Sequence, residues 1–251
     1  MTEVLEAGAW GALGGAALVI GAAVAWFVRV PAAVVAGVMA FGSGVLISAL
    51  AFELVQEAAD VGGVWPTALG FLAGAVVYML ANALLARRGA RHRKRSQGQQ
   101  PREEESSGSG AAIAVGALLD GVPESVVLGA SLLGGAGVST AVVAAVFISN
   151  LPEGLSSAAG MKRSGRSARY VFGVWGGIAV ASAVAAALGY LLLGSASPQA
   201  VAAITAVAAG AILTMLADTM IPEAFERTRT LTGLIAAVGF VTAFAISRAG
   251  G

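Results

Sequence analysis

The sequence has no cysteine, a single histidine and few charges: only 12% of its 251 residues are Asp, Glu, Lys or Arg. The absence of cysteine excludes a disulfide framework, a thiolate metal site and a cysteine nucleophile. Any bound metal would therefore need oxygen or nitrogen ligands. The one histidine, His92, lies in a basic segment with no carboxylate or second imidazole beside it, which argues against a metal there.

Apolar and small residues are abundant instead. Hydrophobic residues make up 57% of the chain and the mean hydropathy is +0.84, outside the range of soluble globular domains. The 35 glycines would suit membrane helices, because small residues let such helices approach closely. Glycines four residues apart occur at Gly11/Gly15, Gly70/Gly74 and Gly173/Gly177. We expect an all-α protein embedded in a lipid bilayer.

Eight segments are long enough to span a membrane, which takes about 20 mainly apolar residues. They lie near 5–28, 32–58, 62–86, 110–134, 138–161, 169–194, 199–224 and 230–248. The first lacks a basic n-region and is expected to be a retained span. Residues 87–109, basic and then rich in Gln, Ser, Gly and Glu, are predicted to be a disordered loop. This loop divides one membrane domain into residues 1–86 with three helices and residues 110–251 with five.

The basic residues predict the topology. With both termini outside the cytoplasm, nearly all of them fall in cytoplasmic loops: Arg29, the 87–102 cluster, Lys162, Arg163, Arg166, Arg169, Arg227 and Arg229. The positive-inside rule favours this arrangement, so we expect a multi-pass protein of the cytoplasmic membrane. The basic run is interpreted as a topology determinant with lipid contact as a secondary role, and no nucleic-acid partner is expected. Helix surfaces rich in glycine and alanine are compatible with a homodimer.

Acidic residues near the middle of two spans carry the chemistry. Asp120 and Glu124, four apart in the fourth span, share one helix face, as Asn150 and Glu153 do in the fifth. A central acid costs about 2.5–3.5 kcal/mol on insertion scales and usually faces a polar pathway. The sequence places no lysine or arginine at that depth. We therefore predict that these four side chains bind a metal cation; the alternative is protonated carboxyls bonded to neighbouring helices.

A Pro-Glu fragment recurs along the chain and indicates internal symmetry. It appears as Gly121–Ser125, Asn150–Gly154 and Ile221–Ala224, with a weaker copy at Glu57-Ala58. Each proline frees a helical carbonyl, and free carbonyls at membrane depth are tolerated where they line a cavity or coordinate ions. The fourth and fifth spans run antiparallel in the predicted topology, as expected for a 3+2+3 inverted repeat of a transporter.

Further acids lie toward the span ends. Glu53 and Glu57 are near the outer end of the second span, and Asp218 and Glu223 are near the inner end of the seventh. They are candidate gate or access residues. The competing interpretation is that residues near helix ends simply reach interfacial water.

Taken together, these motifs resemble the ZIP (Zrt/Irt-like) metal permeases of the bacterial type. That family has eight spans, extracytoplasmic termini and a variable cytoplasmic loop after the third span. Its fourth span carries His-Asn-x-Pro-Glu-Gly and its fifth a related sequence, which Asn150-Leu-Pro-Glu153-Gly matches closely. In the fourth span Asp120 replaces the histidine, Gly121 the asparagine and Ser125 the glycine, while Glu124 matches.

The resemblance implies a divalent cation permease, importing zinc or a related metal such as manganese or iron, with no tightly bound cofactor. A carboxylate in place of imidazole favours harder ions, although affinity order works against a firm assignment. The alternative is a ZIP-like sensor or scaffold that has lost its metal site. No Gly-x-Gly-Asp or His-Glu-x-x-His signature is present, so we do not expect an enzyme.

Overall fold

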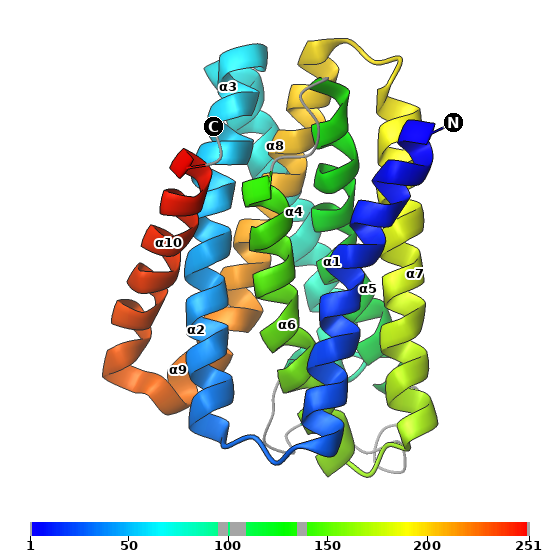
Figure 1. The fold of residues 1–251 in the computed structure, drawn as a ribbon, viewed down its shortest axis with the longest axis vertical. Helices are drawn as coiled ribbons and strands as arrows, with labels where there is room; N and C mark the ends of the chain where they lie inside the picture. Colours follow the sequence, from blue (N-terminus) through cyan, green and yellow to red (C-terminus); the bar gives the residue numbers. More distant parts are fainter. Residues whose placement is uncertain (1, 95–99, 101–108, 135–139, 250–251) are drawn as a thin grey trace.

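The computed structural model describes residues 2–94, 100, 109–134 and 140–249. These residues form only helices and their connections, so the predicted all-α class is confirmed (Figure 1). Seven helical stretches are long and apolar enough to cross a membrane. The α-helices are α1 Thr2–Phe27, α2 Ala32–Ala49, α3 Gln56–Gly62, α4 Val64–Ala86, α5 Ser109–Ser131, α6 Thr140–Arg163, α7 Ala168–Leu193, α8 Pro198–Met215, α9 Ile221–Thr228 and α10 Thr232–Ala249.

The last of the seven stretches, Pro198–Ala249, has 52 residues. A straight helix of that length would measure about 78 Å at about 1.5 Å per residue, more than twice the bilayer core of about 30 Å. The chain instead reverses near Arg229, where φ is 42°, and α10 runs back along α2 (Figure 1). The spans predicted at 199–224 and 230–248 lie on the two arms of this stretch. The count of eight spans stays a prediction.

Two short π-helical segments interrupt the long helices: η1, Leu50–Val55, joins α2 to α3, and η4, Leu216–Met220, joins α8 to α9. Both begin at a Leu-Ala pair, and each contains one of the predicted gate acids, Glu53 and Asp218. Such π-bulges are common at functional sites. The sequence does not predict these two π segments, because residue periodicity does not distinguish a single π turn from the α-helix around it.

The ends of the bundle differ in charge. The start of α1 and the end of α10 lie at one end of the molecule (Figure 1). The α1–α2, α6–α7 and α9–α10 connections lie at the other (Figure 1), and they carry Arg29, Arg166 and Arg229. This asymmetry matches the predicted distribution of basic residues; the orientation in a membrane remains a prediction.

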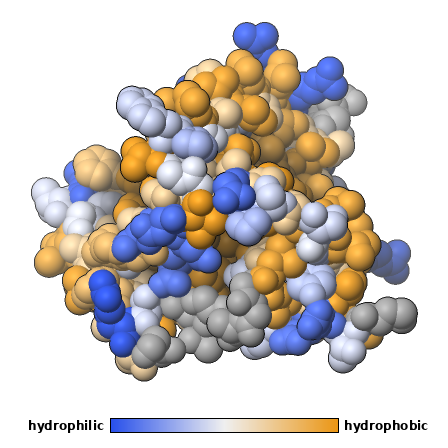
Figure 2. All heavy atoms as spheres, turned by 90° about the horizontal axis from the view of Figure 1, so that it is seen from above, coloured by the Kyte–Doolittle hydropathy of each residue, from blue (hydrophilic) through white to orange (hydrophobic). Residues whose placement is uncertain are grey.

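The outer surface is apolar. Large side chains on α4 and α10, including Leu69, Leu84 and Val241, are exposed. Seen end-on, hydrophobic residues lie along much of the outline, with hydrophilic residues between them (Figure 2). Contiguous apolar surface of this extent marks an interaction surface, and with seven apolar helices of spanning length it is consistent with a protein embedded in lipid.

Glycines set the contact between α2 and α10. A Cβ built on Gly44 of α2 would lie 1.8 Å from the carbonyl oxygen of Ala236, and one on Gly239 of α10 would lie 2.1 Å from that of Phe41. No side chain fits at either position without moving a backbone. The two helices therefore touch backbone to backbone, as small residues permit in membrane bundles.

The contact between α4 and α8 repeats this arrangement. A Cβ on Gly74 of α4 would lie 1.9 Å from the carbonyl oxygen of Val207, and one on Gly210 of α8 would lie 1.8 Å from that of Phe71. Of the three glycine pairs noted in the sequence, Gly70/Gly74 and Gly11/Gly15 lie in helix interfaces, the latter against α7, whereas a Cβ on Gly173 or Gly177 would meet nothing within 4 Å.

Gly74→Val is expected to destabilise the fold by about 1–3 kcal/mol or more, because the branched side chain must push two packed backbones apart. Gly173→Val is the matched control, since the same change there meets open space. The measurement is the midpoint of thermal unfolding in detergent, followed by helical circular dichroism. Equal midpoints for the two variants would contradict the packing described here.

Candidate cation site

The predicted site residues lie in the middle of the bundle. Asp120 and Glu124 are on α5, and Asn150 and Glu153 are on α6. All four side chains are buried, with relative exposures of 1%, 2%, 4% and 3% respectively. Three acids so deeply buried need compensation, because an unpaired charge in a low-dielectric interior is very costly.

Arg93 compensates Asp120. Its Nε donates to Asp120 Oδ2 at 2.9 Å and its Nη2 to Oδ1 at 2.8 Å. Nη1 donates to Asn82 Oδ1 at 2.7 Å, and Nη2 also lies 2.8 Å from the Tyr78 hydroxyl, which donates to Asp120. Two parallel bonds between guanidinium and carboxylate make a strong, directional pair. Both oxygens of Asp120 are thereby occupied.

Burial by itself would lower the pKa of Arg93, but the Asp120 carboxylate and its hydrogen bonds outweigh burial, so that the pKa is raised above its ordinary value. The guanidinium is therefore a charged partner for the Asp120 carboxylate.

Lys94 lies between two of the acids. Its Nζ is 2.9 Å from Glu153 Oε2 and 3.4 Å from Asp120 Oδ2, and only 3% of its side chain is exposed. Lys94 thus joins α5 to α6 electrostatically, at the place where the sequence predicts a bound metal cation.

The expectation that no lysine or arginine reaches these acids is wrong. Arg93 and Lys94 belong to the basic segment that follows α4, which turns back into the bundle through Gly89, at φ 97°, and the 3-10 turn η2, Ala90–His92. Gly116 makes room for it, since a Cβ there would lie 2.6 Å from Arg93 Cδ. Non-helical backbone at such depth is tolerated where protein buries it. Of the loop predicted as disordered, residues 95–99 and 101–108 lie outside the described residues.

Hydrogen bonds hold this segment against the second half of α6. The Ser156 hydroxyl lies 2.6 Å from the carbonyl oxygen of Lys94. Gln100 Nε2 donates to the carbonyl oxygens of Arg93 at 2.8 Å and Ser157 at 3.0 Å. The Ser164 hydroxyl donates to the Gln100 carbonyl at 2.8 Å. Ser156 and Ser157 of α6, and Ser164 just after its end, therefore serve as attachment points for the segment.

Glu124 differs from the other two acids. Neither of its carboxylate oxygens has a hydrogen-bond partner among the described residues. It borders a cavity of about 10 Å³ whose other walls are apolar and include Leu50, Val146 and Ile212. That volume is roughly the least that admits one water. A buried carboxylate without a partner requires explanation, and a cation supplied from elsewhere would provide one.

Asn150 binds the backbone of another helix through its side-chain amide. Its Nδ2 donates to the carbonyl oxygen of Gly14 on α1 at 3.0 Å. Its amide thus ties α6 to α1, and only its oxygen remains for a ligand. Among the described residues, no three Asp, Glu or His side chains converge into a group that could hold a metal ion in this arrangement.

Two of the four predicted gate residues connect to the site. Asp218 Oδ2 accepts from Asn82 Nδ2 at 3.2 Å, and Asn82 in turn accepts from Arg93. Glu223 Oε1 lies 3.1 Å from the Ser156 hydroxyl, which also contacts the Lys94 carbonyl. Both acids therefore contact groups that bind the basic segment.

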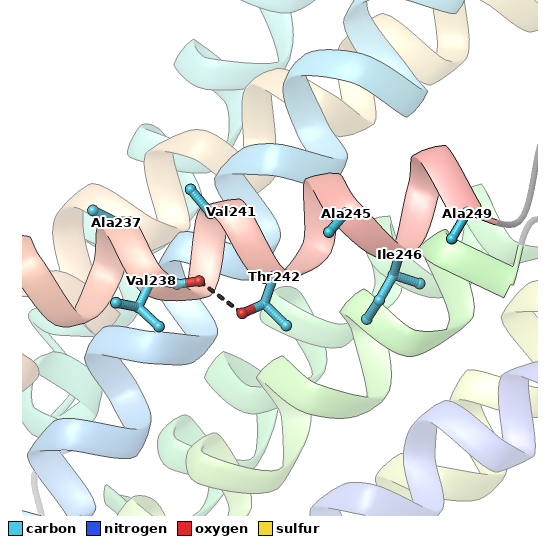
Figure 3. A pocket seen from close by; sticks show the side chains of 7 residues that line it. All are labelled: Ala237, Val238, Val241, Thr242, Ala245, Ile246 and Ala249. Carbon is cyan, nitrogen blue, oxygen red and sulfur yellow. Dashed lines mark hydrogen bonds between the residues drawn. The ribbon is translucent and has the colours of Figure 1, made fainter.

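The other two predicted gate residues lie on η1 and α3. Glu53 accepts a hydrogen bond from Ser247 on α10, and Glu57 is exposed. Elsewhere, a hollow runs along the outer face of α10 (Figure 3). Its lining is apolar except for Thr242, which donates to the Val238 carbonyl of its own helix at 2.8 Å, so this hollow offers no chemistry.

Sequence reasoning missed Tyr78, Asn82, Arg93, Lys94 and Gln100. A signal was present for some of them, because Tyr78 and Asn82 are polar residues four apart on an otherwise apolar span. No protein-family model matches this chain, and no curated protein matches it either.

Proposed function

We propose that this protein is a permease for a divalent metal cation, with the buried carboxylates between α5 and α6 as its binding site. The observation that carries the proposal is the pairing of these acids: their counter-charges come from a segment between helices and not from the helices themselves. A bundle that needed its acids only for structure could pair them within the spans. Counter-charges that are not part of the helices suit a site that binds and then releases a cation.

The charge balance favours a divalent ion. Three carboxylates, Asp120, Glu124 and Glu153, face two cationic side chains, so the described site has one negative charge in excess when all groups are ionised. Replacing one of the two side-chain cations by a divalent ion would make the sum zero. A monovalent ion in the same exchange would leave the excess in place.

Repeated packing supports the inverted repeat that many transporters use. In the α2–α10 and α4–α8 contacts, residues 41 and 44 of α2 have their counterparts at residues 207 and 210 of α8. The π segments that follow start at Leu50 and Leu216, at the same sequence offset. Two halves related in this way could move against each other around a fixed central site.

The proposed transported ion is zinc, manganese or iron. The resemblance to ZIP permeases favours zinc, whereas an all-oxygen site favours harder ions. Direction into the cytoplasm, through the cytoplasmic membrane, is part of the proposal and follows from the same resemblance.

A second candidate is a ZIP-like membrane sensor or scaffold that does not transport. One observation favours it: Arg93 and Lys94 already neutralise Asp120 and Glu153. If these ion pairs are permanent, the site has no need of a metal. The two candidates differ in whether any divalent ion crosses the membrane.

The experiment is uptake of Zn²⁺, Mn²⁺, Fe²⁺, Co²⁺ and Mg²⁺ into metal-free proteoliposomes. It compares the native chain with Glu124→Gln and Glu153→Gln, each also in a Lys94→Gln background that removes the paired ammonium. We expect at least one ion to be taken up, and each Gln variant to lower its uptake at least about tenfold, since loss of even an outer-shell partner of a metal ligand typically costs about 10–100-fold in affinity.

Asp60→Asn is the matched control, because Asp60 is an exposed acid on α3 and its loss should leave uptake unchanged. Uptake of every ion at the level of empty liposomes, in both backgrounds, would reject the permease in favour of the sensor or scaffold. Uptake that survives both Gln substitutions would place the pathway elsewhere in the bundle.

A further inference from the structure

We infer that Lys94 is a built-in competitor for the transported cation: its ammonium occupies the position that the ion takes, and it must leave before the ion binds. This inference rests on the proposed function and assigns the regulation of the same site. It also separates the roles of two adjacent basic residues, Arg93 and Lys94, that the sequence alone does not distinguish.

The contacts of Arg93 are those of an anchor. Its guanidinium donates to Asp120, Asn82 and the Ala90 carbonyl, and it contacts the Tyr78 hydroxyl. These partners come from α4, from α5 and from the segment's own turn. Releasing Arg93 would break all of them together and leave Asp120 buried without its main counter-charge, a change that is strongly unfavourable.

The contacts of Lys94 are those of a removable ion. Its ammonium has two carboxylate neighbours, Glu153 at 2.9 Å and Asp120 at 3.4 Å. Asp120 keeps both hydrogen bonds from Arg93 when Lys94 moves away. Only Glu153 loses its counter-charge, and a metal ion arriving there would restore it. A flexible four-carbon stem lets the ammonium rotate away while the backbone stays in place.

The backbone contacts of the segment fit this division. The carbonyls of Arg93 and Lys94 accept from Gln100 and Ser156, so the main chain is held independently of the Lys94 side chain. The exchange therefore needs a side-chain rotation and not withdrawal of the whole segment. Its result is a neutral site, with Arg93 and a divalent ion facing Asp120, Glu124 and Glu153.

The inference also divides the predicted ligands. Asp120, both of whose oxygens bind Arg93, becomes the anchor's partner. Glu153, which loses Lys94, and Glu124, whose oxygens have no hydrogen-bond partner among the described residues, become the ligands of the ion. The sequence alone predicts all three acids as metal ligands.

The test measures Mn²⁺ and Zn²⁺ binding to the purified full chain in detergent by isothermal titration calorimetry. Lys94→Gln is expected to bind at least one of the ions at least about tenfold more tightly than the native chain, because the competing state no longer holds most of the population. Lys94→Arg, which keeps the charge, should remain as weak as the native chain. Arg91→Gln is the control: it removes a charge from an exposed residue of the same segment and should change nothing.

Three results would be decisive. Tighter binding in Lys94→Gln that disappears in Lys94→Gln/Glu153→Gln supports the inference. Metal binding by the native chain that Lys94→Gln leaves equal or weakens overturns the inference while the proposed permease stands. No binding by any variant, each shown to be folded by circular dichroism and gel filtration, overturns both and makes Lys94 a permanent structural counter-charge.

Discussion

Arg93→Met is expected to lower the free energy of unfolding by about 3–5 kcal/mol, the cost of breaking a buried ion pair by removing one partner. The methionine keeps much of the length and apolar volume of the arginine stem, but Asp120 then loses both guanidinium bonds. Lys94, 3.4 Å from Asp120, supplies part of the missing charge. The loss should therefore fall toward the lower end of this range.

The measurement is equilibrium unfolding in mixed detergent micelles, followed by circular dichroism. Arg91→Met is the control, because this exposed arginine of the same segment should change stability by no more than about 0.5 kcal/mol. Arg93→Met/Asp120→Leu removes both charges and should recover most of the loss, as replacing a whole buried pair is often neutral. Equal stability of Arg93→Met and Arg91→Met would show that Arg93 does not compensate a buried acid.

Joining Gln100→Cys to Ser164→Cys by a disulfide is expected to leave metal uptake unchanged, because Lys94 leaves the site by rotation of its side chain while the backbone of the segment stays in place. The Ser164 hydroxyl lies 2.8 Å from the Gln100 carbonyl, so the two positions are adjacent when the segment is docked. The bond would fix the backbone of the segment, and with it the Arg93 anchor, but it would leave the Lys94 side chain able to rotate.

The natural chain has no cysteine, so the introduced pair is the only one that can form this bond. Uptake into proteoliposomes is measured after oxidation and again after reduction, and the two rates should be equal. Each single-cysteine variant, oxidised in the same way, is the control for loss of the Gln100 and Ser164 side chains. An oxidised double variant that transports at least about tenfold more slowly than its reduced form would show that the whole segment must withdraw, and it would contradict rotation of Lys94 as the step that opens the site.

The limits of sequence reasoning are clearest at the loop after α4. Residues 87–109 are polar, charged and poor in apolar residues, a composition that predicts disorder because it buries too little surface to offset the entropy of ordering. Arg93 and Lys94 are ordered for a different reason. Buried carboxylates on α5 and α6 attract them, and such an electrostatic gain is invisible in the local composition.

The sequence by itself determined the helices, because a run of about 20 apolar residues has one stable form in lipid and its length follows from the bilayer. It also identified Asp120, Glu124, Asn150 and Glu153 as buried polar residues, since a charge inside an apolar span is conspicuous. Only the tertiary structure decided their partners. Asp120 pairs with Arg93 and Glu153 with Lys94 because close packing brings together groups that lie 27 or more residues apart, and no local pattern records such a contact.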